Sequence, residues 1–145
     1  MNAEVWVVED DRALLQGIVT LLKTNSVEAR GFSDPRSALE AALATPPRVL
    51  ITDFAMPALS GVELARELRT RLGASCPRLV LVTGSELRRV ELTLFDQLVR
   101  KPFRFAALLP LIEGYLAPRP GARRASSEVR LRRLGSMRRA GGDGE

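Results

Sequence analysis

The chain has 145 residues, 46% apolar and 27% charged, with a formal net charge of +5, which is the composition of a globular protein of about one domain. It contains no histidine and one cysteine, Cys76, which excludes Ser-His and Cys-His nucleophiles, histidine metal sites and an internal disulfide. A lone cysteine, the absence of a positively charged leader and the absence of a ~20-residue apolar run lead us to expect a cytoplasmic protein without a membrane span.

Five short apolar runs predict the strands of one sheet. Three of them are nearly continuous in Val, Ile and Leu, which is typical of parallel strands covered on both faces. The five runs occupy residues 4–9, 27–32, 48–53, 78–83 and 97–101. Segments of helical period lie between or after them, at residues 12–24, 35–44, 61–72 and 104–116. Ser60 is a candidate N-cap for the third of these helices, and Leu21 belongs to the predicted apolar stripe of the first.

Alternation of strands and helices predicts a parallel sheet with helices on both faces, because a right-handed crossover needs the intervening helix. For five units the leading topology is a flavodoxin-like (βα)5 doubly wound α/β fold with strand order 2-1-3-4-5. Ligands of such sheets bind beyond the C-terminal strand ends where the winding reverses, here beside the first and third strands. We expect this domain to cover residues 1–117.

Carboxylates stand at those two strand ends. Glu9 ends the first predicted strand, Asp10 follows it, and Asp53 ends the third. Crowded carboxylates repel each other and raise one another's pKa unless a cation is present. An all-oxygen ligand set suits Mg²⁺ or Mn²⁺, and Mg²⁺ usually combines one or two carboxylates with phosphate oxygens. The strand ends therefore predict a site that binds a divalent metal and a phosphoryl group together.

The last two strands add groups suited to phosphate. Thr83 ends the fourth strand with a hydroxyl that can donate to a phosphoryl oxygen, and Gly84 leaves room beside it. Lys101 ends the fifth strand and offers a compact positive charge. Pro102 follows the lysine, and a cis bond there would turn the lysine inward.

With these residues the chain resembles the receiver domain of bacterial two-component response regulators. The resemblance covers about residues 4–117 and is carried by "VVEDD", "LITDFAMPALSG", "LVTG" and "RKPF". It implies that Asp53 accepts a phosphoryl group from a sensor histidine kinase or a histidine phosphotransfer protein. It also implies that Glu9, Asp10, Asp53 and the backbone carbonyl of Ala55 hold Mg²⁺. In the same way it implies that Thr83 is the switch hydroxyl and Lys101 the phosphate-pairing lysine.

Other positions are expected to modulate the site. The resemblance places Ala55 and Ser85 beside the hydrolytic water, while Asp11 is expected to serve the N-terminus of the following helix. Leu98 stands where the family commonly has an aromatic switch residue. Only 17 residues separate Thr83 from Lys101, fewer than the family's fourth helix and its connections need. We therefore expect the phosphorylation chemistry to be kept, while coupling and dimerisation through the fourth-helix face are in question.

Residues 118–145 form an Arg-rich tail that is expected to be disordered. Residues 1–118 hold 14 basic and 14 acidic residues, whereas residues 119–145 hold eight arginines and three acidic residues, so the whole excess charge is in the tail. A solvated tail is the simpler interpretation, and contact with nucleic acid or an acidic partner is the alternative.

The sequence as a whole predicts a phosphoacceptor signalling domain, not an enzyme, that acts through protein-protein contacts with a downstream target and has no separate output domain. Three alternatives stay open: a phosphorylation-independent interaction module, a receiver fragment of a hybrid histidine kinase, and a dehalogenase-type phosphatase. The phosphatase would need an Asp-x-Asp motif with its nucleophile on the first strand. This chain reads "VVEDD" there and has its isolated acid, Asp53, on the third strand. Flavin binding would need a Ser/Thr/Gly-rich phosphate loop where this chain is acidic. The oligomeric state is left open.

Overall fold

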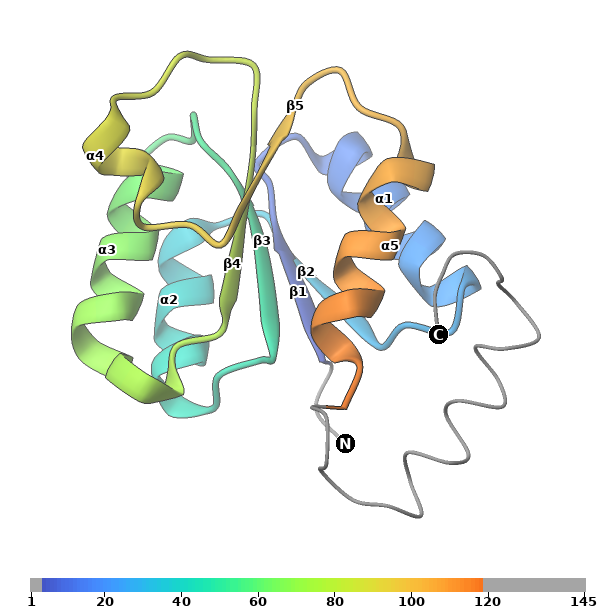
Figure 1. Cartoon of the computed structure of the whole chain (residues 1–145), viewed down its shortest axis with the longest axis horizontal. Helices are drawn as coiled ribbons and strands as arrows, with labels where there is room; N and C mark the ends of the chain where they lie inside the picture. The colour runs from blue at the N-terminus through green and yellow to red at the C-terminus, as the bar shows by residue number, and fades with distance from the viewer. Residues whose placement is uncertain (1–3, 119–145) are drawn as a thin grey trace.

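A computed structural model describes residues 4–118 (Figure 1). Five strands alternate with helices in chain order. The elements are β1 (Val5–Val8), α1 (Arg12–Thr24), β2 (Ala29–Phe32), α2 (Pro35–Ala44), β3 (Val49–Asp53), α3 (Gly61–Leu72), the 3-10 turn η1 (Gly73–Ser75), β4 (Arg78–Thr83), α4 (Arg89–Leu92), β5 (Gln97–Arg100) and α5 (Phe105–Leu116). The predicted strands and helices are all present, and they differ from the prediction by no more than two residues at any end. The predicted disorder of residues 119–145 lies outside the described residues.

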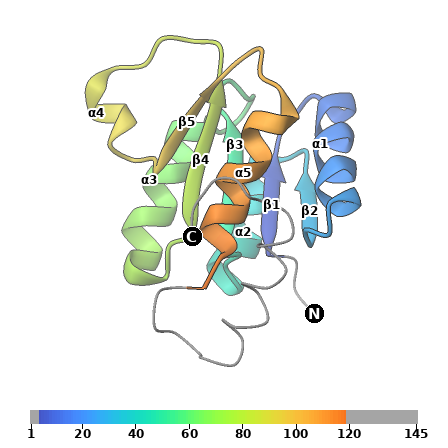
Figure 2. The same ribbon diagram turned by 45° about the vertical axis from the view of Figure 1, so that its right-hand side comes forward.

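All strand pairs are parallel, and the sheet order is β2-β1-β3-β4-β5, which confirms the predicted flavodoxin-like topology. Figures 1 and 2 show α1 and α5 on one face of the sheet and α2 and α3 on the other. This doubly wound arrangement brings the C-terminal ends of β1, β3, β4 and β5 to one edge. Within residues 4–118, no helix has the length and apolar character needed to cross a bilayer.

Each face of the sheet has its own apolar core, because successive strand residues point to opposite sides. Val5 and Val7 of β1 pack with Ile18 and Leu22 of α1 and with α5. Trp6 of the same strand packs on the other face, against α2 and α3. The central strands are thus buried on both faces, which explains their nearly continuous run of Val, Ile and Leu. Leu21 departs from the predicted stripe: its position on α1 faces outward, and it is 42% exposed.

Side chains fix the start of the helices that follow β1 and β3. Asp11 is the N-cap of α1, and its carboxylate accepts hydrogen bonds from the N–H groups of Ala13 and Leu14 at 3.1 and 3.2 Å. Ser60 caps α3 in a reciprocal capping box with Glu63. Both caps lie in loops that also carry site residues, so they define where those loops turn into helix.

The helix α4 is a single turn, Arg89–Leu92, in agreement with the short spacing between Thr83 and Lys101. Asp96 anchors the end of this connection. Its carboxylate lies 3.0 Å from the Arg69 guanidinium and 3.3 Å from that of Arg78, and it accepts a hydrogen bond from the N–H of Leu79 at 2.8 Å. Arg69 also donates to the carbonyl of Leu94 at 2.8 Å. These bonds hold the α4–β5 connection against α3 and β4 without a full-length fourth helix.

Candidate functional site

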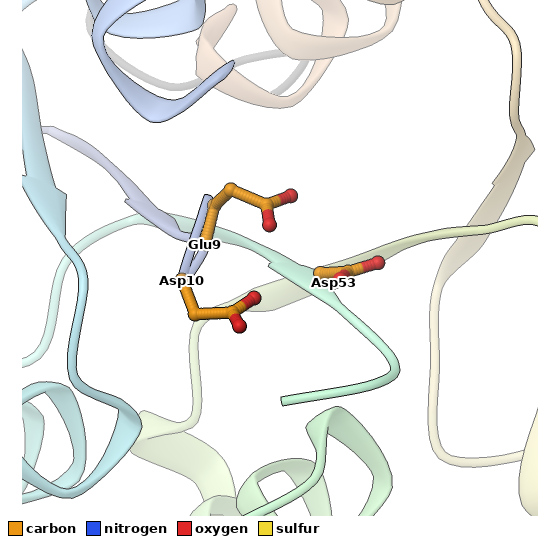
Figure 3. A group of neighbouring side chains, drawn as sticks. All are labelled: Glu9, Asp10 and Asp53. Atoms are coloured by element: carbon orange, nitrogen blue, oxygen red, sulfur yellow. The ribbon is translucent and has the colours of Figure 1, made fainter. Parts of the chain in front are cut away.

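Three carboxylates meet at the C-terminal edge of the sheet. Val8 of β1 is paired with Thr52 of β3, so the residues that follow them, Glu9 and Asp53, are adjacent in space. Glu9 and Asp10 project from the end of β1 toward Asp53 (Figure 3). A carboxylate oxygen from each of the three residues lies within 4.8 Å of the others. The strand register alone therefore brings together acids that are more than 40 positions apart in the chain.

The environment of Glu9 disfavours its charged form. Its residue surface is only 4% exposed, and burial is the main cause that raises the pKa of its carboxyl. The nearby charge of Asp53 raises the pKa further, whereas the N–H of Asp11, which donates to Glu9 at 3.1 Å, and the charge of Lys101 lower it. The balance is a raised pKa, as expected for crowded carboxylates in a site that a cation would complete.

Lys101 is the positive group of the site. Its Nζ atom lies 3.2 Å from Oδ1 of Asp53 and 3.7 Å from Oε1 of Glu9. Partial burial alone would lower the pKa of Lys101, but its hydrogen bonds with Asp53 and Glu9 and its attraction to both carboxylates raise the pKa above its usual value. The peptide bond between Lys101 and Pro102 is cis, which is the isomer that we considered from the sequence for turning the lysine inward. Lys101 thus offsets one of the three carboxylate charges.

Thr83 ends β4 beside this group and is almost fully buried, at 1% exposure. Its carbonyl accepts a hydrogen bond from the N–H of Lys101 at 2.9 Å, which ties the ends of β4 and β5 together. Its hydroxyl oxygen accepts a hydrogen bond from the N–H of Ser85 at 2.9 Å. Since that bond uses a lone pair of the oxygen, the hydroxyl proton is free to donate to another acceptor.

The predicted modulating residues occupy different surroundings. Ala55 is exposed in the β3–α3 loop, and Ser85 is half-buried in the loop after Thr83. Leu98 is half-buried on β5, beside a groove that Ala107 and Leu111 of α5 also line. It is paired with Leu81 in the middle of β4, so the structure does not place it with the carboxylates.

Two glycines beside the site differ in their need for space. A Cβ added at Gly84 would make only an ordinary contact of 3.7 Å with Cβ of Lys101. A Cβ at Gly61 would instead collide with the carbonyl oxygen of Asp53. Gly61, whose N–H donates to the carbonyl of Phe54 at 2.9 Å, was not predicted as a site residue. The sequence feature that could have identified Gly61 is its position just after the N-cap Ser60 and eight residues after Asp53.

The donor set at this edge fits a hard divalent cation. Within residues 4–118, Glu9, Asp10 and Asp53 are the group of acidic, histidine or cysteine side chains that are close enough together to share an ion. All their ligand atoms are carboxylate oxygens, which suit Mg²⁺ and do not suit a thiolate- or imidazole-seeking metal.

Comparison with known proteins points to one family. The response regulator receiver domain family matches residues 5–113 of the chain. The response regulator MprA of Mycolicibacterium vanbaalenii is 30% identical over 119 residues, a match that covers 80% of this chain and 51% of MprA. MprA of Mycobacterium ulcerans is 31% identical with the same coverage. The chain spans about half the length of these curated relatives.

Solved structures of the same kind share the fold. A CheY-like response regulator receiver domain from Methylobacillus flagellatus has a TM-score of 0.71 and 25% identity, and the match covers 79% of this chain and 99% of that one. The response regulator TrrA of Thermotoga maritima, solved in complex with Mg²⁺-BeF, has a TM-score of 0.70 and 22% identity with the same coverage. A signal receiver domain from Bermanella marisrubri has a TM-score of 0.67 and 26% identity, also with the same coverage.

Proposed function

Because the chain belongs to the response regulator receiver domain family, we propose that it accepts a phosphoryl group on Asp53 from a phosphohistidine of a partner protein. The family is one of phosphoacceptor signalling domains, and its partners are histidine kinases. The acidic group of Glu9, Asp10 and Asp53 is typical of its phosphoacceptor pocket. The identity of the acceptor, the metal ligands and the downstream target are the parts we propose.

The observation that carries this proposal is the position of Asp53 between a cation and two further acids. Its Oδ1 atom lies 3.2 Å from Nζ of Lys101, and its side chain is 11% exposed. An ionised carboxylate is already a nucleophile, so its attack on phosphorus needs no histidine as base on this chain. Phosphoryl transfer depends mostly on in-line positioning and on neutralising charge, and Lys101 is placed to neutralise part of that charge.

In the proposed step, an oxygen of Asp53 forms a bond to phosphorus while the bond from phosphorus to the partner's imidazole nitrogen breaks. The imidazole keeps the electron pair of that bond and leaves with the partner. Lys101 would pair with the phosphoryl oxygens, and the Thr83 hydroxyl, keeping its proton, would donate a hydrogen bond to one of them. Glu9, Asp10 and the carbonyl of Ala55 would hold Mg²⁺ next to Asp53. The bound ion would neutralise part of the phosphoryl charge.

Phosphorylation would add negative charge where Thr83 and Lys101 converge, which favours a state with both groups drawn toward Asp53. We propose that a downstream protein reads this change by direct contact in the cytoplasm. Because α4 is a single turn, it offers a partner protein less surface than a long fourth helix would. We therefore propose that the downstream protein contacts the surfaces near β5 and α5.

Phosphate-affinity electrophoresis of the full chain tests the acceptor. With Mg²⁺ and a small acyl phosphate donor, the wild type should show one retarded band, whereas Asp53→Asn should show none. Glu40→Gln, which removes an exposed acid from α2, is the matched control and should behave as the wild type does. If calorimetry confirms Mg²⁺ binding and the wild type is still not retarded, the domain acts without phosphorylation and the proposal fails.

A further inference from the structure

Three polar or charged residues are buried among residues 4–118: Glu9, Thr52 and Thr83. They stand at or next to the C-terminal ends of the neighbouring strands β1, β3 and β4. Glu9 and Thr83 belong to the proposed phosphoacceptor site. Thr52 directly precedes Asp53 and is 1% exposed, yet the proposed phosphoryl transfer does not use it. A buried hydroxyl beside the acceptor therefore needs a physical explanation.

The surroundings of the Thr52 side chain are apolar. Thr52 is paired in register with Val8 of β1 and with Leu81 of β4, and both of these partners are fully buried. It follows Leu50 by two positions on β3, so its side chain lies on the face of the sheet that packs against α2 and α3. Valine has nearly the shape of threonine and suits a strand equally well. Packing alone thus does not explain a hydroxyl at this position.

The hydroxyl of Thr52 donates a hydrogen bond to the backbone carbonyl of Asp53 at 2.9 Å. A buried hydroxyl without such a bond would cost free energy. One residue later, the N–H of Gly61 donates to the carbonyl of Phe54 at 2.9 Å. The backbone of Gly61 also lies so close to the Asp53 carbonyl that a Cβ would collide with it. Two successive carbonyls are thus held where the chain leaves β3, the first by Thr52 and the second by Gly61.

The direction of the Asp53 carbonyl determines where the chain goes next. The carboxylate of Asp53 branches from Cα, whereas its carbonyl turns about the bond between Cα and the carbonyl carbon, one of two soft torsions in each residue. Rotation about that bond leaves the root of the carboxylate in place and swings the following peptides, including that of Ala55. A hydrogen bond from a side chain buried in the sheet restricts this rotation. The carbonyl of Ala55 is the proposed backbone ligand of Mg²⁺.

Thr52 is not placed to accept a phosphoryl group itself. Successive strand residues point to opposite faces of the sheet, and the Thr52 side chain points into the core under α2 and α3. With 1% of the residue exposed, a phosphoryl donor cannot reach the hydroxyl while the sheet is folded. Any effect of Thr52 on the chemistry must therefore pass through the backbone of Asp53.

From these contacts we propose that Thr52 is a positioning residue of the phosphoacceptor site. Its hydroxyl holds the Asp53 carbonyl, and the chain then leaves β3 in the direction that presents the carbonyl of Ala55 to the ion bound by Asp53. This inference rests on the proposed function, because it assumes the metal ligands proposed there. Removing a group that orients the ligands of a metal commonly costs about 10- to 100-fold in metal affinity or activity.

Calorimetry with Mg²⁺ and the full chain tests the proposal. Thr52→Val keeps the shape of the side chain but removes the donor, so the dissociation constant for Mg²⁺ should rise about tenfold. Thr52→Ser keeps the donor and should bind Mg²⁺ nearly as the wild type does. The matched control is Thr24→Val, which removes an exposed hydroxyl that donates to the carbonyl of Thr20 at 2.8 Å at the end of α1. This control should leave the affinity for Mg²⁺ unchanged.

The stability of the variants separates positioning from a purely structural role. Serine lacks the buried methyl group of threonine, whereas valine keeps the core filled. Urea unfolding, followed by the fluorescence of Trp6, should therefore find Thr52→Ser less stable than Thr52→Val, although the serine variant binds Mg²⁺ more tightly. A residue that acted only by stabilising the fold would give the same order in both measurements.

The rate of phosphorylation from a small acyl phosphate gives a second readout when it is followed against the concentration of Mg²⁺. In Thr52→Val, the Mg²⁺ concentration that gives half of the maximal rate should rise about tenfold. The maximal rate itself should change little, because a high concentration of Mg²⁺ compensates for weaker binding. A partly unfolded variant would instead lose maximal rate at an unchanged Mg²⁺ requirement.

The proposal is overturned if Thr52→Val binds Mg²⁺ as the wild type does, if Thr52→Ser loses as much affinity as Thr52→Val, or if Thr24→Val weakens binding equally. A wild type that binds no Mg²⁺ would refute both the proposed metal ligands and this role of Thr52. If the wild type takes no phosphate while the variants keep the expected order of Mg²⁺ affinity, the proposed acceptor is refuted and the positioning role of Thr52 is supported.

Discussion

The backbone of Gly61 at the start of α3 lies directly against the carbonyl group of Asp53. A Cβ at position 61 would collide with that carbonyl oxygen and come within 3.1 Å of the carbonyl carbon and 3.2 Å of Cα of Phe54. These are backbone atoms, so they cannot turn aside as the end of a flexible side chain can. The absence of a side chain at Gly61 therefore determines how closely α3 approaches the proposed acceptor.

We predict that Gly61→Ala shifts the β3–α3 loop and destabilises the fold by about 1–3 kcal/mol, the usual cost of forcing an extra carbon into a packed site. Because Asp53 would move with its carbonyl, phosphorylation from a small donor should also slow. Urea unfolding and phosphate-affinity electrophoresis measure the two effects.

Gly17→Ala is the matched control. Gly17 lies inside α1, and a Cβ there would meet no atom within 4 Å. Alanine should therefore stabilise the helix by up to about 1 kcal/mol. Equal stability of Gly61→Ala and the wild type would show that the loop absorbs the extra carbon.

A second prediction concerns Asp96, which holds the α4–β5 connection. Burial alone would raise the pKa of this carboxyl, but the N–H of Leu79, the hydrogen bond from Arg69 and the charge of Arg69 together hold the pKa below its ordinary value of 3.8. An acid whose pKa is lower in the folded state stabilises the fold above its unfolded pKa, and this contribution is lost as the pH falls through the folded pKa.

Asp96→Asn should therefore lower the free energy of unfolding by about 1.5–3 kcal/mol at pH 7, the range for hydrogen bonds to charged groups. The difference from the wild type should begin to shrink below about pH 4, where the carboxyl of the unfolded chain binds a proton, and should be lost as the pH falls through the lowered pKa of the folded state. Urea unfolding at pH 7 and at pH 3 provides the comparison. Glu86→Gln, at a side chain that is 96% exposed, is the control and should change little. A difference that is the same at both pH values would mean that the charge of Asp96 contributes nothing.

Most of the fold could be predicted from the sequence because each strand carries a strong local signal. The runs at β3 and β4 are apolar on both faces, and such runs bounded by helical periods allow few topologies. Leu21 was placed wrongly because an apolar residue at the margin of a helical stripe lies toward or away from the core depending on how the helix rotates on the sheet. Only tertiary packing decides that rotation.

The acidic site could be predicted in the same way, because parallel strands end at one edge and place Glu9, Asp10 and Asp53 together. Gly61 could not be recognised, since its role depends on a close backbone approach that leaves no pattern in residue type. Arg48 and Arg78, at the starts of β3 and β4, line one cleft together with Tyr115 near the end of α5. Each of these residues alone reads as an ordinary surface residue.

The third prediction concerns the hydroxyl of Thr83. Thr83→Val keeps the shape of the side chain but leaves the N–H of Ser85 without its acceptor, which should cost about 1–3 kcal/mol of stability for a half-buried donor. Thr83→Ser keeps the acceptor and should lose less. Urea unfolding ranks the three proteins, and a valine variant as stable as the wild type would show that water replaces the hydroxyl at Ser85.

The last prediction separates two effects of Lys101, one on the affinity of the carboxylates for Mg²⁺ and one on the rate of phosphorylation. Lys101→Met removes the positive charge that lies 3.2 Å from Asp53 and 3.7 Å from Glu9. Without it the carboxylates attract a divalent cation more strongly, and the affinity for Mg²⁺ should rise about tenfold, the order expected for removing one like charge beside a divalent ion. Phosphorylation should nevertheless slow by about 100-fold, because the lysine no longer stabilises the charge on the transferred group.

Calorimetry with Mg²⁺ and the time course of phosphate-affinity electrophoresis measure these opposite changes. Lys23→Met removes the other lysine of the chain, at an exposed position near the end of α1, and should change neither quantity. A general loss of folding in Lys101→Met would lower both the affinity for Mg²⁺ and the rate of phosphorylation. Tighter Mg²⁺ binding combined with slower transfer therefore cannot arise from unfolding, whereas unchanged Mg²⁺ affinity would place the ion away from Lys101 and the carboxylates it contacts.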